Sequence, residues 1–569
     1  MTSITNCNPA FKKILIVLGL LLANFGAFTQ TLPVGLLHGI EDAYRRQQLM
    51  GNDTSLSSFM IRPLNISTRT DLMLDEASGI SISGFRHKLF STPSDKVAIY
   101  TLPVVWQNQV NSHHPYGMND GSMIQAKGYQ TQLSAGVFAK IGPLSIQLRP
   151  EFVYAANSDF KQLHETEAEN GTTFIRNYAN YYNTIDLPER FGDSPYSRAS
   201  WGQSSIRLTF DPVSVGISNE NLWWGPGNKS SLLMSNNASG FKHITLNTSR
   251  PVKTYIGSFE GQIVAGRLEN SGVPVPSGGL YNDILSDWRY FSGMVVSYQP
   301  KWVPNLYLGF DRSFVVDKEN IGSGFSAYLP IFSPAQKKLT GERDPVTGLN
   351  EDDLKKRDQY ISFFTRWVMP ESNAEIYFQY GRNDHAYDLR DAIVEPEHSR
   401  AYLVGFLKLI PLKRLDQNIQ IGVEIVQMER SKTSAVRAQP TWYRHGLVRG
   451  GYTNTGQVLG AGVGPGGNMQ SIDISWVNGL SKVGIDIERI VHNNDLFYQT
   501  VNDARRNWVD LAFGGKFDKS IGHFLLNAQL KLVHSYNYNY GIKNIRSAWD
   551  WDKQDANNLN LKVGILYNW

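Results

Sequence analysis

Segments in which apolar and polar side chains alternate recur along the chain. The longest covers residues 523–540. Its even positions are mostly apolar and its odd positions mostly polar, as in Leu526, Ala528, Leu530 and Leu532 against Asn527, Gln529 and Lys531. A period of two is that of a β-strand with one face in an apolar environment. Beyond Gln30, no run approaches the roughly 18 apolar residues of a membrane-spanning helix. The closest, residues 401–412, is interrupted by Lys408 and Pro411.

The connections between these segments distinguish a membrane barrel from a soluble β-sandwich. From Gln359 onward, short connections (368–374, 410–417, 478–482 and 518–522) alternate with long polar ones (383–400, 428–468, 491–506 and 541–556). Short periplasmic turns and long outer loops give this alternation in outer-membrane barrels. The sequence therefore predicts an all-β fold, a transmembrane antiparallel β-barrel located in the outer membrane.

Carried toward the N terminus, the same alternation predicts eighteen strands. They lie near residues 99–107, 129–140, 144–154, 203–210, 213–219, 241–248, 253–268, 288–298, 305–315, 359–367, 375–382, 401–409, 418–427, 469–477, 483–490, 507–517, 523–540 and 557–569. An even number of strands places both ends of the barrel on the periplasmic side. Without residues 1–29, which we expect to be cleaved, 540 of the 569 residues remain, and they give one large barrel with about 30 residues per strand and connection in place of several globular domains.

Both ends of the chain carry targeting signals. Lys12 and Lys13 precede an apolar run over residues 14–23, which is the order of a secretory signal peptide, and we expect one over residues 1–29. A single membrane anchor is the alternative, but the run is short for a span. At the other end, residues 562–569, which end in Trp569, resemble the C-terminal signal that the barrel-assembly machinery reads. That machinery is therefore an expected partner, as is outer-membrane lipid.

A short helix is expected in front of the barrel. Leu36, Leu37, Ile40 and Tyr44 recur at helical spacing in a segment that ends at Gly51. This pattern predicts a short amphipathic periplasmic helix. We expect residues 30–95 to form an N-terminal periplasmic helical or plug segment. Residues 96–569 are expected to form the outer-membrane barrel.

Composition and charge exclude several classes of protein. Charged residues make up 19% of the chain, below the roughly 25% of soluble domains, and aromatic residues reach 12%. The formal net charge is +4, with both signs spread along the chain, so no basic stripe is available for nucleic acid. The single cysteine, Cys7, precedes the apolar run of the expected signal peptide. This excludes a disulfide framework, a Cys-based zinc site and a lipoprotein cysteine.

The connection between the fifth and sixth expected strands carries the most distinctive motif. It reads Trp223-Trp224-Gly225-Pro226-Gly227, followed by Ser235-Asn236-Asn237-Ala238. This motif resembles the Wzi family of capsule-assembly outer-membrane proteins. The stretches 115–121, 185–192, 202–205 and 456–462 resemble that family's form in Bacteroidetes-type bacteria. The resemblance runs from about residue 32 to Trp569. It implies an eighteen-stranded barrel with a periplasmic helical element that holds capsular polysaccharide at the cell surface as a lectin.

The chemistry of two outer loops agrees with a lectin. Aromatic rings offer flat apolar faces to sugar rings, and amides and carboxylates pair with hydroxyl groups. The candidate carbohydrate-binding residues are Asn219, Glu220, Asn221, Trp223, Trp224, Lys229, Asn236 and Asn237 in the first loop, and Trp442, Tyr443 and Arg444 in the second. Alternatively, the two Trp anchor the barrel at the membrane interface and Gly225-Pro226-Gly227 is only a tight turn.

Basic residues in the outer loops would suit an acidic polysaccharide. The candidates are Lys229 and Lys242 around the Trp-Trp motif, and Arg444 and Arg449 in the loop 428–468. The alternative is that these long side chains are only solvated.

A diffusion porin and a polysaccharide-cleaving enzyme are the alternative functions. Asp186, Glu189 and Glu220 could supply an acid/base pair. Salt bridges to wall arginines such as Arg190 and Arg207 are the commoner role for such carboxylates. The chain also lacks the G-x-S-x-G and H-E-x-x-H motifs. We therefore expect no catalytic residues.

Two weaker patterns in the sequence predict no further site. Residues 462–467 fit the G-x-G-x-x-G pattern of dinucleotide sites, but no βαβ unit surrounds them, and we expect a loop that folds into the barrel mouth. His113, His114 and Asp120 are weak evidence for a metal. The sequence thus predicts neither a metal nor a cofactor.

Overall fold

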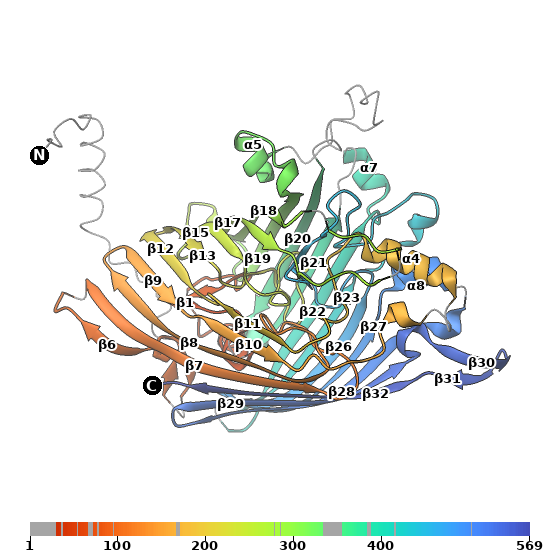
Figure 1. Ribbon diagram of the computed structural model, residues 1–569. Coiled ribbons are helices and arrows are strands. Elements are labelled where there is room, and N and C mark those ends of the chain that lie inside the picture. The colour runs from red at the N-terminus through yellow and green to blue at the C-terminus, as the bar shows by residue number, and fades with distance from the viewer. Residues whose placement is uncertain are drawn as a thin grey trace, which may run out of the picture.

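The computed structural model is a closed antiparallel barrel of 18 strands, counted over the described residues (Figure 1). It describes residues 30–35, 38–53, 55–66, 72–76, 79–94, 96–166, 171–277, 279–284, 286–333, 356–383, 389–414, 417–501 and 503–569. The expected signal peptide, together with Leu36 and Leu37 of the expected helix, lies outside these residues.

The predicted strand count and strand order are confirmed. The wall consists of β7 (Val97–Asn111), β8 (Gly128–Ile141), β9 (Leu144–Leu148) with β10 (Glu151–Ala155), β11 (Tyr196–Ser200) with β12 (Ser205–Phe210), β13 (Val213–Ser218), β15 (Lys242–Thr248), β17 (Gly257–Glu269), β18 (Trp288–Pro300), β19 (Leu306–Asp317), β20 (Arg357–Met369), β21 (Ala374–Asn383), β22 (Arg400–Pro411), β23 (Gln417–Gln427), β26 (Asn468–Asn478), β27 (Ser481–Val491), β28 (Val509–Ile521), β29 (Phe524–Tyr536) and β32 (Ala556–Tyr567). The last strand closes the barrel, because β32 pairs with both β29 and β7.

Two crossings of the wall are each made of two strands. β9 and β10 both pair with β8 on one side. On the other side, β11 pairs with β10 and β12 pairs with β9. The prediction for the second of these crossings, residues 203–210, missed β11. The reason is that Trp201 and Gly202 interrupt the strand and break the alternation.

The smaller elements are two-stranded pairs, additions to the wall, and short helices. The pairs are β1 (Thr31–Leu32) with β3 (Leu64–Asn65), β2 (Ile61–Arg62) with β14 (Trp223–Trp224), β4 (Met73–Asp75) with β5 (Ile80–Ser81), β24 (Thr453–Asn454) with β25 (Gln457–Val458), and β30 (Ile542–Ser547) with β31 (Asp550–Lys553). β6 (His87–Ser91) and β16 (Val252–Lys253) add to the wall beside β7 and β17. The α-helices are α2 (His38–Leu49), α4 (Thr172–Tyr182), α5 (Phe325–Tyr328), α7 (Leu389–Val394) and α8 (Asn494–Thr500). Within the described ranges, no helix combines the length and the apolar character needed to cross a membrane.

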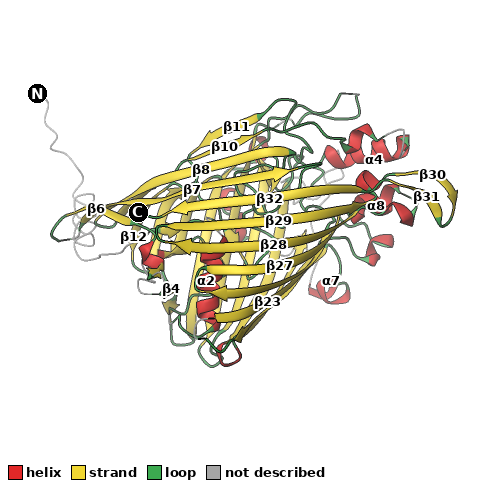
Figure 2. Cartoon of the chain, turned by 90° about the horizontal axis from the view of Figure 1, so that it is seen from below, coloured by secondary structure: helices red, strands yellow, loops and turns green. Residues whose placement is uncertain are grey.

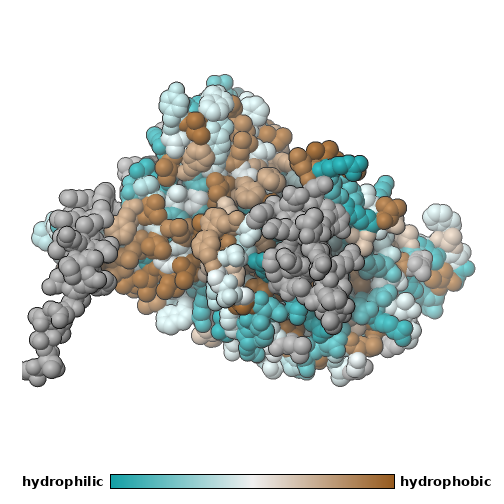
Figure 3. Space-filling view, turned by 90° about the horizontal axis from the view of Figure 1, so that it is seen from above, coloured by the Kyte–Doolittle hydropathy of each residue, from teal (hydrophilic) through white to brown (hydrophobic). Residues whose placement is uncertain are grey.

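The wall turns its apolar face outward and its polar face inward. In β26, Ile472 and Ile474 are 47% and 44% exposed, whereas Ser471, Asp473 and Ser475 between them are buried. This is the reverse of a soluble protein and suits a wall with lipid outside. Apolar side chains gather in a broad patch on the surface seen in Figure 3. Exposed aromatic rings lie in or beside the short turns and at the C terminus, namely Tyr255, Trp302, Trp367 and Trp569.

The expected N-terminal helix is present as α2 and lies at the end of the barrel that carries the short turns (Figure 2). Its Arg46 donates to the carbonyl of Gly479, which lies in the turn between β26 and β27. Its Arg45 pairs with the carboxylate of Glu375 in β21, and both side chains are at most 1% exposed. Arg366 in β20 donates to the same carboxylate, at 2.5 and 2.8 Å. The helix is therefore held to the inner wall by buried charge pairs.

Gly405 in the wall leaves room for the ring of Tyr377, which helps to hold the loop segment around Asn228 and Lys229 inside the lumen. A Cβ added at Gly405 in β22 would lie 2.1 Å from the Tyr377 ring. The Tyr377 hydroxyl donates to Glu424 Oε2 at 2.8 Å. Glu424 in turn accepts the backbone N–H groups of Asn228, at 2.7 Å, and Lys229, at 3.1 Å. The bare backbone at Gly405 thus positions a tyrosine that positions the acceptor for the loop.

Replacing Gly405 by Ala is therefore expected to displace the Tyr377 ring and to destabilise the barrel by about 1–3 kcal/mol, the usual cost of overpacking. Gly422→Ala in the neighbouring strand β23 is the matched control, because the nearest atom to its added Cβ is 3.4 Å away. Urea unfolding in lipid vesicles measures the free energy of unfolding of both variants. Equal stability of the two would contradict the role of Gly405.

Candidate functional site

The long loops enclose a cavity of about 250 Å³ at their end of the barrel. Its lining comes from the connections that follow β7, β10, β23, β27 and β29, from the connection between β13 and β15, and from the adjoining strand ends. The aromatic members are Tyr116, Tyr178, Tyr181, Phe191, Trp508 and Tyr540, and the polar members include Gln125, Glu189, Asn237, Gln457, His492 and Asn493. We call this the mouth cavity. Flat rings and hydrogen-bonding groups on a concave surface are the features of a small-molecule site.

Helix α4 forms one side of the mouth cavity because its apolar residues recur at helical spacing. Phe174, Ile175, Tyr178, Ala179 and Tyr181 are its buried residues. Helix α4 packs on α8, and the two helices lie together at the end of the barrel beyond which the β30–β31 hairpin projects (Figure 2). The ring of Tyr540 lies between them, 5.9 Å from Phe174 and 6.0 Å from Phe497. These contacts order three loops that are far apart in sequence.

Trp508 is held in one orientation at the cavity wall. Its ring stacks on His492 with centroids 4.0 Å apart, and its Nε1 donates to Asp510 Oδ1 at 3.1 Å. The second oxygen of Asp510 lies 2.8 Å from His492 Nε2. One carboxylate therefore fixes both rings. A ring fixed in this way loses little entropy when a ligand stacks on it.

Glu189 is a carboxylate in the lining of the mouth cavity. It accepts the Tyr178 hydroxyl at 2.5 Å and the backbone N–H of Leu163 at 2.8 Å. Burial raises the pKa of Glu189 to about 7, and the two hydrogen bonds oppose this shift only in part. Glu165 nearby adds to the rise in the pKa. Glu189 therefore joins α4 to the connection after β10 and changes charge near neutral pH.

The packing of α4 at the mouth cavity is expected to lose stability as the pH rises through about 7. Because the pKa of Glu189 is raised above its ordinary 4.5, the folded state keeps a proton that the unfolded state has released. This contribution is complete below pH 4.5 and is lost as Glu189 ionises. Hydrogen exchange of the α4 amides, corrected for intrinsic rates, should show less protection at pH 8.5 than at pH 5.5. Glu189→Gln should remove the difference, and equal protection of the wild-type protein at both values would refute the prediction.

The structure places the Trp-Trp motif inside the lumen. Residues 219–241 turn inward from β13, and β14 pairs with β2 of the N-terminal segment. Trp224 is fully buried and its Nε1 donates to Gln262 at 2.9 Å. Trp223 is 3% exposed and lies 4.2 Å from the guanidinium of Arg62. Neither ring faces lipid, so the alternative that they anchor the barrel at the membrane interface is wrong.

The polar residues of the motif are engaged within the lumen. Asn219 donates to the carbonyl of Gly202 at 3.0 Å. Glu220 is paired with Arg207 at 2.7 Å, which confirms the expected salt bridge to a wall arginine. Burial by itself would raise the pKa of Glu220. The positive charge of Arg207 and the hydrogen bonds that Glu220 accepts outweigh this effect, so the pKa of Glu220 is lowered. Asn221 donates to the carbonyl of Ala238 at 3.2 Å.

Three further candidates from the first loop line cavities. Asn237 reaches the mouth cavity, where its amide donates to the carbonyl of Val458 at 3.0 Å. Asn236 and Lys229, together with Trp223, line a second cavity of about 180 Å³ deeper in the lumen. Lys229 there pairs with Glu488 and lies 3.7 Å from Asp486. Of the eight candidates in this loop, only Asn237 is brought to the mouth cavity.

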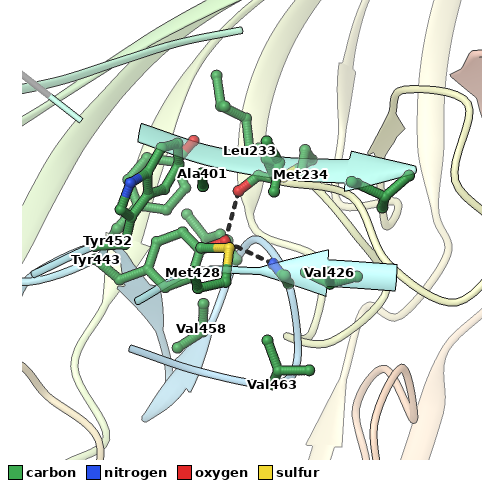
Figure 4. Close-up of a cluster of buried hydrophobic side chains, with 14 of the residues drawn as sticks. Leu233, Met234, Ala401, Val426, Met428, Tyr443, Tyr452, Val458 and Val463 are labelled. Atoms are coloured by element: carbon green, nitrogen blue, oxygen red, sulfur yellow. Dashed lines mark hydrogen bonds between the residues drawn. The ribbon is translucent and has the colours of Figure 1, made fainter. Parts of the chain in front are cut away.

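The candidates of the second loop pack against the first loop and against α4. Trp442 and Tyr443 are at most 1% exposed. The Tyr443 hydroxyl donates to the carbonyl of Leu232 at 2.6 Å and accepts the N–H of Ala461 at 2.8 Å (Figure 4). Arg444 donates to Thr184 at 2.8 Å, and its guanidinium lies 4.3 Å from the Tyr181 ring. Carbohydrate binding by these residues stays a prediction.

Sequence reasoning missed most of the mouth cavity. Tyr538 and Tyr540 were assigned to the strand 523–540, but β29 ends at Tyr536. Asn537, Asn539 and Tyr540 have positive φ, which turns the chain over the mouth. The alternation of Tyr and Asn looks like a strand, yet Asn also tolerates left-handed backbone. The expectation that residues 462–467 fold into the mouth is confirmed, since Gly462, Val463 and Gly464 line the cavity.

The weak metal signal finds no support in the described ranges, where no group of three or more metal-binding side chains occurs. The His113 and His114 rings are nearly perpendicular, with 3.0 Å between their Nδ1 atoms. Asp120 is instead paired with Lys562 at 2.6 Å. The three candidates therefore do not form one site.

One protein family and several solved structures resemble the chain. The family model for capsule assembly protein Wzi matches residues 105–518. No curated protein sequence matches. The structure of Wzi from Escherichia coli, an outer membrane protein involved in group 1 capsule assembly and described as a carbohydrate-binding β-barrel, is similar over 95% of this chain and 100% of that one, with 11% identity and a TM-score of 0.59. OccAB2 from Acinetobacter baumannii matches over 82% of this chain and 97% of its own, with 12% identity and a TM-score of 0.39.

Proposed function

Because the chain belongs to the Wzi family of capsule assembly proteins, we propose that it is an outer-membrane lectin that binds capsular or extracellular polysaccharide at the cell surface. The observation that carries the proposal is the mouth cavity, in which Trp508, Tyr178, Tyr181 and Tyr540 lie beside amide and carboxyl groups. Stacking faces and hydroxyl partners within one cavity are what a sugar ring requires. The cavity opens among the long loops, which face the exterior in outer-membrane barrels.

The proposal includes the placement of the chain in the membrane. The apolar outer wall contacts lipid, and the end with the short turns, where α2 lies, faces the periplasm. The barrel-assembly machinery reads residues 562–569, which contain the end of β32 and Trp569. Residues 30–95 then act as a periplasmic plug segment.

The test is deletion of the gene, followed by staining of cell-bound and shed polysaccharide. We expect less polysaccharide on the cells and more in the medium. A copy of the gene that carries Trp508→Ala should fail to restore retention, while a wild-type copy restores it. Unchanged polysaccharide in both fractions would end the proposal.

If the protein were a diffusion porin, it would form large steady channels in planar bilayers. In this chain α2, residues 219–241 and the loop after β23 occupy the lumen, and they are held by buried pairs such as Arg207 with Glu220. We therefore expect no large steady channels in planar bilayers. Such channels would favour the porin.

A polysaccharide-cleaving enzyme needs two carboxyl groups about 5–10 Å apart across the sugar. Among the described residues that line the mouth cavity, Glu189 is the only carboxylate. Asp186 accepts hydrogen bonds from Ser271, and Glu220 is paired with Arg207 in the lumen. Incubation of the purified protein with polysaccharide is expected to leave the chain length unchanged, and shortened products would favour the enzyme.

A further inference from the structure

We propose that the mouth cavity binds an uncharged segment of polysaccharide, made of neutral pyranose residues, and discriminates against residues that carry a carboxylate, sulfate or phosphate. This inference rests on the proposed lectin function and names the class of sugar that the site takes. It departs from the expectation that basic loop residues hold an acidic polymer.

The charge of the lining is the first argument. Among the described residues that line the mouth cavity, none is Lys or Arg. Its ionisable members, apart from tyrosines, are Glu189 and His492. His492 is already engaged with Asp510 at 2.8 Å. An anionic sugar would therefore meet a carboxylate and no free cation, and like charges at short range oppose binding.

Three basic residues of the outer loops and the lumen are committed elsewhere. Arg444 is directed to Thr184 and to the ring of Tyr181. Arg190, next to Glu189 in sequence, pairs with Asp159 at 2.8 Å and Asp193 at 3.3 Å. Lys229 lies in the lumen against Glu488. None of these charges is left for a uronate in the mouth cavity.

Two glutamine amides of the lining are the second argument, because they present hydrogen-bond acceptors. The amide nitrogens of Gln125 and Gln457 donate to the carbonyls of Gly117 at 2.7 Å and Met123 at 3.1 Å, so each amide offers its oxygen to a ligand. Glu189 is an acceptor when ionised. A sugar hydroxyl can donate to such oxygens, whereas an ionised carboxylate or sulfate only accepts.

The size of the cavity is the third argument. An apolar cavity of about 150 Å³ holds one benzene ring. The mouth cavity, at about 250 Å³, therefore has room for about one or two six-membered rings. The aromatic rings around it can stack only on the C–H faces of those rings. The site therefore suits a short segment of a longer chain that continues into the medium.

Binding to matched pairs of saccharides tests the inference. The full chain, purified in detergent micelles, is titrated at pH 8.5, where Glu189 is ionised, with a panel of uronate-containing hexasaccharides and with their carboxyl-reduced counterparts, which differ only in charge. We expect the reduced member of each bound pair to bind at least tenfold more tightly, with an affinity that changes little between 50 and 500 mM salt. Tighter binding of the uronate members would overturn the inference and leave the lectin in place. Binding of no member of any pair would contradict the proposed lectin function itself.

Variants separate charge from stacking. Glu189→Gln should lower the ratio of the affinity for the reduced member to the affinity for the uronate member severalfold, because it removes the negative charge that repels the uronate. Trp508→Ala should weaken both members by a similar factor. Asp283→Asn is the control, since this exposed carboxylate lies in the loop between β17 and β18, does not line the cavity and should leave the ratio unchanged. A ratio that Glu189→Gln and Asp283→Asn alter equally would overturn the role of the cavity. Heat-modifiable migration on gels verifies that each barrel is folded.

Discussion

Trp508→Ala is expected to weaken polysaccharide binding roughly thirtyfold, since the loss of a central aromatic contact in a concave site costs about 2 kcal/mol or more. The ring lines the mouth cavity and is fixed by His492 and Asp510, so a sugar stacks on it without ordering it first. The substitution removes no wall contact between strands, because Trp508 precedes β28. Titration of the folded barrel with the bound saccharide measures the effect.

The matched control is Trp508→Phe, which keeps a flat ring but loses the hydrogen bond to Asp510. It should retain most of the affinity. Trp549, at 92% exposure in the hairpin between β30 and β31, provides a second control outside the mouth cavity. If Trp549→Ala weakened binding more than Trp508→Ala, the site would lie on the hairpin and not in the mouth.

Glu375→Ala is expected to be the most destabilising single substitution considered for the lumen, at about 3–5 kcal/mol. Its carboxylate is fully buried and accepts hydrogen bonds from both Arg45 of α2 and Arg366 of β20. Removing it leaves two guanidinium groups buried without their counter-charge. Urea unfolding in vesicles measures the loss, and release of α2 should also appear as bursts of conductance in planar bilayers.

The control for this prediction is Glu371→Ala, in the short turn between β20 and β21. Glu371 is exposed, and surface charges contribute little to stability. It should behave as the wild-type protein in both assays. A Glu375→Ala barrel that unfolds at the wild-type urea concentration and stays closed would contradict the role assigned to the buried cluster.

The two predictions concern regions that sequence reasoning treated very differently. The wall could be located closely, as for β23, predicted at 418–427 and observed at Gln417–Gln427. The mouth could not. Trp223 and Glu220 were expected to meet sugar, but they lie in the lumen against Arg62 and Arg207. Trp508 was assigned to a strand, yet it lines the mouth cavity.

The physical reason is the range of the interactions. By itself, the sequence determined the barrel and its 18 strands, because the alternation between an outward apolar face and an inward polar face lies in neighbouring residues. Only the tertiary structure decided which loops fold inward, since this depends on partners such as Tyr443 and Leu232 that are 211 residues apart. Aromatic rings, amides and carboxylates serve equally well to pack a lumen and to bind a sugar. Their position in three dimensions is what separates the two roles.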